Sequence, residues 1–153
     1  MHPDAVHIRD ATTRDLPRIV EIEQLSFSTP WSLNSFRREL GLPFSRLMVA
    51  VPAVDVNASA MGFLCRWLLA DECHVLNVAV HPDFRRTGVG LELMRATLSE
   101  AKTKGAKLVT LEVRRSNLAA RCLYRKLDFS EQRLRRNYYG PGEDAIVMEL
   151  RLG

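Results

Sequence analysis

The chain has 153 residues, of which 46% are hydrophobic and 26% are charged. This length and composition are typical of a globular domain and argue against a disordered chain. Lysine and arginine number 22 against 18 acidic residues, so the net charge is +4. That mild excess suits an anionic ligand and is too small to require nucleic acid. We expect residues 1–153 to form a single domain.

The sequence predicts neither a secretory leader nor a membrane span. The first residues carry no basic region followed by an apolar run. The longest apolar stretch, residues 60–70, is interrupted by an arginine and is far shorter than a membrane helix requires.

Cysteines and histidines show no metal-site pattern. Cys65, Cys73 and Cys122 include no C-x-x-C pair, so we expect free thiols in a reducing cytoplasm. His74 adjoins Cys73 in a predicted strand, where neighbours face opposite sides and make a poor ligand pair. His81 precedes a proline at a strand end and is interpreted as a loop residue.

The first half of the sequence predicts one strand, two helices and three more strands. Residues 6–9 alternate between polar and apolar side chains, as a strand does. Thr12 or Thr13 can cap a following helix that has an apolar stripe. Ser32 can cap a second helix, which residues 41–43 would end. Three strands are predicted at residues 46–51, 60–69 and 73–80, with a hairpin loop at 52–59.

The second half predicts helices that alternate with strands, and then a final hairpin. Residues 88–104 have a helical apolar face and are followed by Gly105 as a stop signal. A strand is predicted at 108–113 and a short helix at 117–126, before two strands that flank a turn at 139–142. A strand–helix–strand order implies one parallel pair among hairpins. We therefore expect an α/β (α+β) fold, with a mixed, mostly antiparallel sheet of about seven strands flanked by about four helices.

The sharpest feature is a strand followed by a basic loop and a helix that opens with two glycines. Its sequence is Val78-Ala79-Val80-His81-Pro82-Asp83-Phe84-Arg85-Arg86-Thr87-Gly88-Val89-Gly90. Glycine lets a ligand approach the backbone closely, and the first amides of a helix point outward without intrahelical acceptors. Together with the helix dipole and two arginines, these amides predict a phosphate site.

Two familiar phosphate motifs are excluded here. No Lys-Ser or Lys-Thr follows the glycines, so the segment is not a Walker loop, and the third glycine of a dinucleotide fingerprint is missing. The remaining alternative is that the two glycines only ease a helix start against a neighbouring strand.

Arg85-Arg86-Thr87-Gly88-Val89-Gly90 resembles the R/Q-x-x-G-x-G/A signature of the GNAT acetyltransferase superfamily, in the expected strand-to-helix position. In that family the helix is followed by a strand, then by a second helix that begins with asparagine, and then by a tyrosine that precedes a Gly-Phe pair. Residues 111–117 followed by 123–129 are similar to this arrangement. The resemblance covers nearly the whole chain and implies a GNAT-like, acetyl-CoA-dependent N-acetyltransferase without a metal. Asp128 replaces the usual glycine, and because Asp tolerates the left-handed region we expect the turn to survive.

Two further segments narrow the resemblance. Phe27-Ser28-Thr29-Pro30-Trp31-Ser32 and Arg135-Arg136-Asn137-Tyr138-Tyr139, with Glu143-Asp144-Ala145 downstream, resemble the RimI-type N-terminal acetyltransferases. That family modifies the α-amine of a ribosomal protein, typically on an N-terminal alanine. The resemblance implies a cytoplasmic enzyme whose partners are acetyl-CoA and the N-terminus of an acceptor protein, such as a ribosomal protein, and neither nucleic acid nor a membrane.

The resemblance also implies the site residues. Glu112 would be the general base and Tyr124 the general acid, while a backbone amide near the end of the preceding strand polarises the thioester. Glu112 lies opposite the apolar face of its strand, where it could be partly desolvated. An exposed carboxylate and a packed core tyrosine are the alternatives. The implied cofactor-binding residues are Val78, Ala79, Val80, Arg85, Arg86, Thr87, Gly88, Val89, Gly90, Asn117 and Tyr124, with Asn117 also a helix N-cap.

Trp31, Tyr138 and Tyr139 are predicted walls of the acceptor groove. Trp31 could instead cap the core, and the basic and aromatic run at 133–139 also occurs on surfaces that bind single-stranded nucleic acid. Two other functions stay open: acetylation of a lysine side chain or small amine, and a non-catalytic module that binds acyl-CoA.

Overall fold

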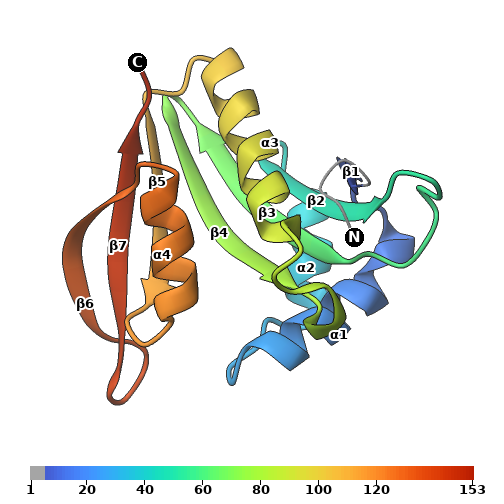
Figure 1. Ribbon diagram of the computed structural model, residues 1–153, viewed down its shortest axis with the longest axis horizontal. Coiled ribbons are helices and arrows are strands. Elements are labelled where there is room, and N and C mark those ends of the chain that lie inside the picture. The colour runs from blue at the N-terminus through green and yellow to red at the C-terminus, as the bar shows by residue number, and fades with distance from the viewer. Residues whose placement is uncertain (1–5) are drawn as a thin grey trace.

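The computed structural model describes residues 6–153 as one seven-stranded sheet with helices on both faces (Figure 1). The strand order is β1-β2-β3-β4-β5-β7-β6, and every neighbouring pair is antiparallel except β4 and β5. The elements are β1 (Val6–Asp10), η2 (Thr13–Asp15), α1 (Leu16–Ser26), α2 (Leu33–Leu40), β2 (Ser45–Pro52), β3 (Gly62–Leu69), β4 (Glu72–Val80), η3 (Pro82–Phe84), α3 (Val89–Thr103), β5 (Leu108–Arg114), α4 (Leu118–Lys126), β6 (Ser130–Gly140) and β7 (Glu143–Arg151).

The predicted fold class and element order are confirmed. The leader prediction rests on residues 1–5, which lie outside the described residues. Within residues 6–153, no helix has the length and apolarity that crossing a membrane would need. Cys65, Cys73 and Cys122 are free thiols, as expected.

Two hydrophobic clusters cover the two faces of the sheet. One includes Leu93 of α3 and the apolar residues of β5, and the other includes Ile19 of α1 and Phe36 of α2. Because side chains alternate along a strand, Glu112 lies on the α1 and α2 side, opposite the apolar face of β5. This is the arrangement that the sequence predicts.

The sheet opens between its two parallel strands. Pairing of β4 with β5 runs only from Glu72 with Leu108 to Val75 with Leu111. Against β3 the register shifts at the same level, so that Leu76 is an extra residue in β4, a β-bulge. Beyond the bulge β4 and β5 diverge, as Figure 1 shows. The β5 side of residues 76–80 therefore has no partner strand.

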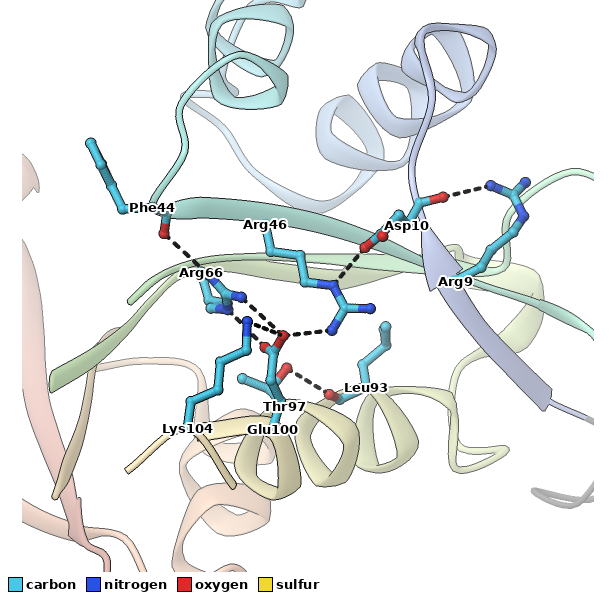
Figure 2. A network of polar contacts seen from close by, with 9 residues as sticks. All are labelled: Arg9, Asp10, Phe44, Arg46, Arg66, Leu93, Thr97, Glu100 and Lys104. Carbon is cyan, nitrogen blue, oxygen red and sulfur yellow. Dashed lines mark hydrogen bonds and ion pairs between the residues drawn. The ribbon is translucent and has the colours of Figure 1, made fainter. Parts of the chain in front are cut away.

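A buried ionic network holds α3 against the sheet (Figure 2). The guanidinium of Arg66, 5% exposed, donates to both carboxylate oxygens of Glu100 at 2.9 and 3.0 Å. Arg46 donates to Glu100 Oε2 at 2.8 Å and also binds Asp10, and Lys104 lies 3.7 Å from Glu100. Removing one partner of the buried Arg66–Glu100 pair costs about 3–5 kcal/mol, whereas the more exposed Arg46, Asp10 and Lys104 contribute less. The network anchors the C-terminal half of α3 and thereby fixes the direction of its N-terminus.

Candidate active site

The N-terminus of α3 forms one wall of the opening. Gly88 caps the helix with φ +90°, a conformation that favours glycine. A Cβ placed on Gly90 would come no closer than 3.6 Å to Val80 and 3.9 Å to Leu123. A methyl group at position 90 would make ordinary van der Waals contacts with these two side chains, so the packing of the protein itself does not require glycine there. The first amides of α3 have no intrahelical acceptors and can bind the phosphates of a ligand such as acetyl-CoA.

The basic loop before α3 is partly committed to internal contacts. Arg85 donates from Nε to the carbonyl of Val80 at 3.0 Å and from Nη2 to Ser26 Oγ at 3.2 Å. Thr87 donates its hydroxyl to the carbonyl of Phe84. Arg86 is exposed and has φ +63°. Arg85 and Thr87 thus shape the loop, and the exposed Arg86 also places a cation at the surface.

Helix α4 borders the other side of the opening. Asn117 is its N-cap, as predicted, because its side-chain oxygen accepts from the amide of Ala120 at 3.1 Å. After the helix, Asp128 adopts φ +73°, which confirms that aspartate can replace the expected glycine. Tyr124 is 6% exposed and packs against Phe129, with 5.9 Å between ring centroids.

Glu112 lies at the point where β4 and β5 separate. Its Oε1 is 2.8 Å from His74 Nε2 and 3.5 Å from the hydroxyl of Tyr138, which donates to it. Burial raises the pKa of this carboxyl, but the hydrogen bond from His74 and its charge when it is protonated, together with Arg135 and Tyr138, bring the pKa below its ordinary value. Glu112 is therefore ionised at neutral pH and ready to accept a proton.

An aromatic pair connects the two expected catalytic residues. The rings of Tyr138 and Tyr139 meet edge to face, with centroids 5.0 Å apart. Burial, then Tyr138 and Glu112, raise the pKa of Tyr139 to about 12. Burial and the neighbouring Tyr139 likewise raise the pKa of Tyr124. The structure thus gathers Glu112, Tyr138 and Tyr139 at the opening, while Tyr124 is buried against Phe129 and near enough to Tyr139 for the two to influence each other.

Arg114 and Glu23 attach the loop between α1 and α2 to this cluster. Arg114 lies 4.2 Å from the centre of the Tyr139 ring, and its Nη2 donates to Ser28 and Thr29 at 3.4 and 3.3 Å. Glu23, 1% exposed, accepts from the amide of Trp31 at 2.9 Å. The Trp31 ring is partly buried and packs on the core, with its centroid 5.2 Å from that of Phe36.

Sequence reasoning missed Glu23 and Arg114 and set His74 aside. A signal for Glu23 was present, because a carboxylate four residues after Ile19 stands inside the apolar stripe of α1. Arg114 is two residues from Glu112 and so shares its face of β5. His74 has no such signal, because its contact with Glu112 depends on the register of two parallel strands. Within the described part of the chain, no three His, Cys, Asp or Glu side chains gather as a metal site.

The fold and the site define an acetyl-CoA-dependent N-acetyltransferase. A split parallel pair, a helix that begins at Gly88 and a glutamate beside the split are the structural features that agree with this class. The sequence model described as the acetyltransferase (GNAT) family matches residues 16–129, and the chain belongs to that family.

Individual members of the family show which kind of acetyltransferase this chain is most similar to among those compared below. The chain is 39% identical over 142 residues to the ribosomal protein bS18-alanine N-acetyltransferase of Salmonella typhimurium, covering 91% of this chain and 93% of the relative. The crystal structure of the ribosomal-protein-S18-alanine N-acetyltransferase from Escherichia coli matches with a TM-score of 0.86 and 34% identity, covering 97% and 94% of the two chains. Ard1 from Thermoplasma volcanium matches with a TM-score of 0.85 and 29% identity, covering 97% and 99%. The predicted resemblance to RimI-type enzymes is confirmed.

Proposed function

We propose that this enzyme acetylates the N-terminal α-amine of a ribosomal protein whose first residue is alanine. The observation that carries the proposal is identity of 36–39%, over more than nine-tenths of the chain, to enzymes named for that reaction. An α-ammonium, with a reference pKa of about 7.7–8.0, gives up its proton more readily than a lysine side chain at about 10.4. A carboxylate base such as Glu112 is closer in pKa to an α-ammonium than to a lysine ammonium, so proton transfer from the α-ammonium is less unfavourable. The same proposal includes a cytoplasmic location and residues 1–153 acting as one domain.

Within this proposal the protein side chains have separate tasks. Glu112 takes a proton from the acceptor's α-ammonium, and Tyr124 gives its phenolic proton to the departing thiolate. Burial keeps that phenolic proton in place at physiological pH, because the pKa of Tyr124 is raised. Acetyl-CoA supplies the acetyl group as a thioester. Holding both reactants at one opening contributes much of the rate acceleration.

The cofactor would lie along the opening between β4 and β5. The loop at residues 85–90 and the first amides of α3 bind its phosphates. Residues 78–80 and Asn117 line the remainder of its path, and a main-chain amide of β4 polarises the thioester carbonyl. The missing partner strand beside residues 76–80 supports this assignment, because it leaves main-chain groups free for a ligand.

The acceptor would enter between the loop after α1 and the tyrosines of β6. Tyr138 is 45% exposed and its hydroxyl reaches Glu112, so a peptide that approaches the base contacts this ring. Tyr139 and the half-buried edge of Trp31 complete the walls. The contacts of Arg114 with Ser28 and Thr29 support a defined, rather than loose, entrance.

A thiol-release assay with acetyl-CoA tests the proposal. The acceptors are peptides with free N-terminal alanine, serine or methionine, an N-blocked lysine peptide and spermidine. We expect turnover on the alanine peptide, reduced about 10²–10⁴-fold in Glu112→Gln. Glu131→Gln is the matched control, since this exposed carboxylate pairs with Arg121 and Arg125 on α4.

Each other outcome of this assay changes the conclusion in a defined way. Turnover confined to the lysine peptide or spermidine would replace the proposed acceptor. Binding of acetyl-CoA without turnover on any acceptor would support a non-catalytic module instead.

A further inference from the structure

His74 and Glu112 form a hydrogen-bonded pair across the two parallel strands. His74 Nε2 lies 2.8 Å from Glu112 Oε1, and the two side chains are 33% and 11% exposed. His74 is opposite Thr110 in the register, and Glu112 is two residues further along β5 on the same face. Since the last β4–β5 pair is at Leu111, Glu112 stands at the opening and His74 lies behind it.

Within the described residues, only one of the two carboxylate oxygens of Glu112 is hydrogen-bonded to the protein. Within residues 6–153, both hydrogen bonds to Glu112 go to Oε1, one from Tyr138 and one shared with His74. Oε2 has no donor from the described part of the protein. It is therefore the oxygen that remains for a proton brought by the acceptor.

Other titratable and charged groups surround this pair from several elements. Arg135 of β6 lies close enough to lower the pKa of Glu112. Two more cations lie on this face: Arg114, two residues after Glu112 in β5, and Arg133 of β6, which is in register with Glu112 through Val147. The acidic groups that face this part of the sheet are Glu149 of β7 opposite Thr110, Glu72 on the His74 face of β4, Glu39 of α2 bonded to the Trp67 indole opposite His74, and Glu23 of α1 bonded to Asn77.

We propose that His74 is a positioning residue that makes the action of Glu112 as a base depend on pH. This inference rests on the proposed catalytic role of Glu112. Neutral imidazole donates its Nε2–H to Oε1, which orients the carboxylate and leaves Oε2 to take the proton. Protonated imidazole instead forms an ion pair with Glu112, and a proton arriving at Oε2 would neutralise one half of that pair. Glu112 is therefore a weaker base when His74 is charged.

The proton and electron pairs balance without any additional reactant. The α-ammonium gives one proton to Glu112 Oε2, and the freed amine attacks the acetyl carbonyl. The C–N bond forms, the C–S bond breaks and Tyr124 gives its phenolic proton to the thiolate. The second proton that the acceptor nitrogen loses restores the phenol, Glu112 releases its proton to solvent, and His74 keeps its ring proton throughout. Imidazole is the side chain that ordinarily changes its charge between pH 5 and 8.

His74→Gln separates hydrogen bonding from charge, because the amide can donate to Glu112 but cannot become protonated. The kcat/KM values of the wild-type enzyme and this variant are measured on one acceptor peptide from about pH 6 to pH 8.5. Ionisation of the acceptor amine is common to both enzymes and cancels in their ratio. We expect the ratio of variant to wild type to be near one at pH 8 and to be several-fold higher at pH 6.

His74→Ala completes the series, because it removes the donor as well as the charge. It should lower activity several-fold at every pH, since Glu112 Oε1 loses a partner. A His74→Gln ratio that stays constant with pH would overturn the proposal and assign His74 a purely structural role. If the wild-type enzyme fails to turn over an N-terminal peptide, or Glu112→Gln retains activity, the proposed function fails instead.

A second measurement does not depend on the folding of any His74 variant. Nitrogen-15 NMR of the His74 ring follows its protonation directly in the wild-type protein and in Glu112→Gln. Coupling requires that the ring protonates at a higher pH when the Glu112 carboxylate is present. Identical titrations in the two proteins would overturn the proposal.

Discussion

Glu23 of α1 and Asn77 of β4, 54 positions apart in the chain, share a 2.7 Å hydrogen bond beneath the opening of the sheet. The second carboxylate oxygen of Glu23 accepts from the backbone amide of Trp31. Asn77 directly follows the bulge at Leu76, where β4 leaves β5. A single buried carboxylate therefore connects the acceptor loop to the strand that would hold the acetyl donor.

Removing this carboxylate should destabilise the protein and disturb the acceptor side. Glu23→Ala leaves two donors without their acceptor in a buried place, which costs on the order of 2 kcal/mol in the free energy of unfolding. Urea unfolding measures the loss, and steady-state kinetics should show a raised KM for the acceptor peptide. Glu21→Ala is the control, because this exposed residue of the same helix forms a surface ion pair with Arg18. It should change stability by less than about 0.5 kcal/mol.

The pH dependence of stability should identify the protonation state of Glu23. Burial raises the pKa of Glu23 above its ordinary value of 4.5, against the opposing effect of the hydrogen bonds from Trp31 and Asn77. A carboxyl whose folded pKa is raised contributes stability below the ordinary pKa, and this contribution is lost as pH rises through the folded pKa. Glu23→Gln should therefore gain stability relative to wild type between about pH 4.5 and neutrality. Urea unfolding over that range checks the trend, which a constant difference would contradict.

Tyr124→Phe should affect catalysis far more than stability. The ring is buried against Phe129, and phenylalanine preserves its shape, so the free energy of unfolding should change by less than about 1.5 kcal/mol. Loss of the phenolic proton should lower kcat about 10²-fold, at the low end for a general acid. Rapid-mixing kinetics and acetyl-CoA titration separate the two effects. Unchanged kcat would remove Tyr124 from the mechanism.

Gly88→Ala should weaken acetyl-CoA binding through the conformation of the loop. At φ +90° a Cβ costs about 1–2 kcal/mol, which the loop can relieve by moving away from the start of α3. The KM for acetyl-CoA should rise about tenfold, corresponding to about 1.4 kcal/mol. Gly105→Ala is a matched control, because Gly105 has φ +83°, a Cβ added there would meet no atom within 4 Å, and it follows the opposite end of α3. The same increase in both variants would contradict a role for Gly88 at the ligand.

Local features of this protein could be predicted from neighbouring residues. Ser32 and Asn117 cap α2 and α4 through hydrogen bonds to amides three residues away, so the signal and the structure lie within one turn. Gly88 and Asp128 adopt positive φ where the sequence places a helix start and a tight turn. Alternation along β5 likewise determines that Glu112 faces away from the apolar cluster.

Contacts between segments that are distant in the chain could be known only from the tertiary structure. The extra residue in β4 is Leu76, yet nothing in residues 72–80 distinguishes it from its neighbours, because the bulge depends on pairing with β3. His74 meets Glu112 because the parallel register sets Thr110 opposite it, and a shift of one residue would turn the imidazole away. The sequence by itself determined the elements, their caps and the chemical types of the site residues. The partner of each site residue depends on strand register and helix packing, which are collective properties of the folded chain.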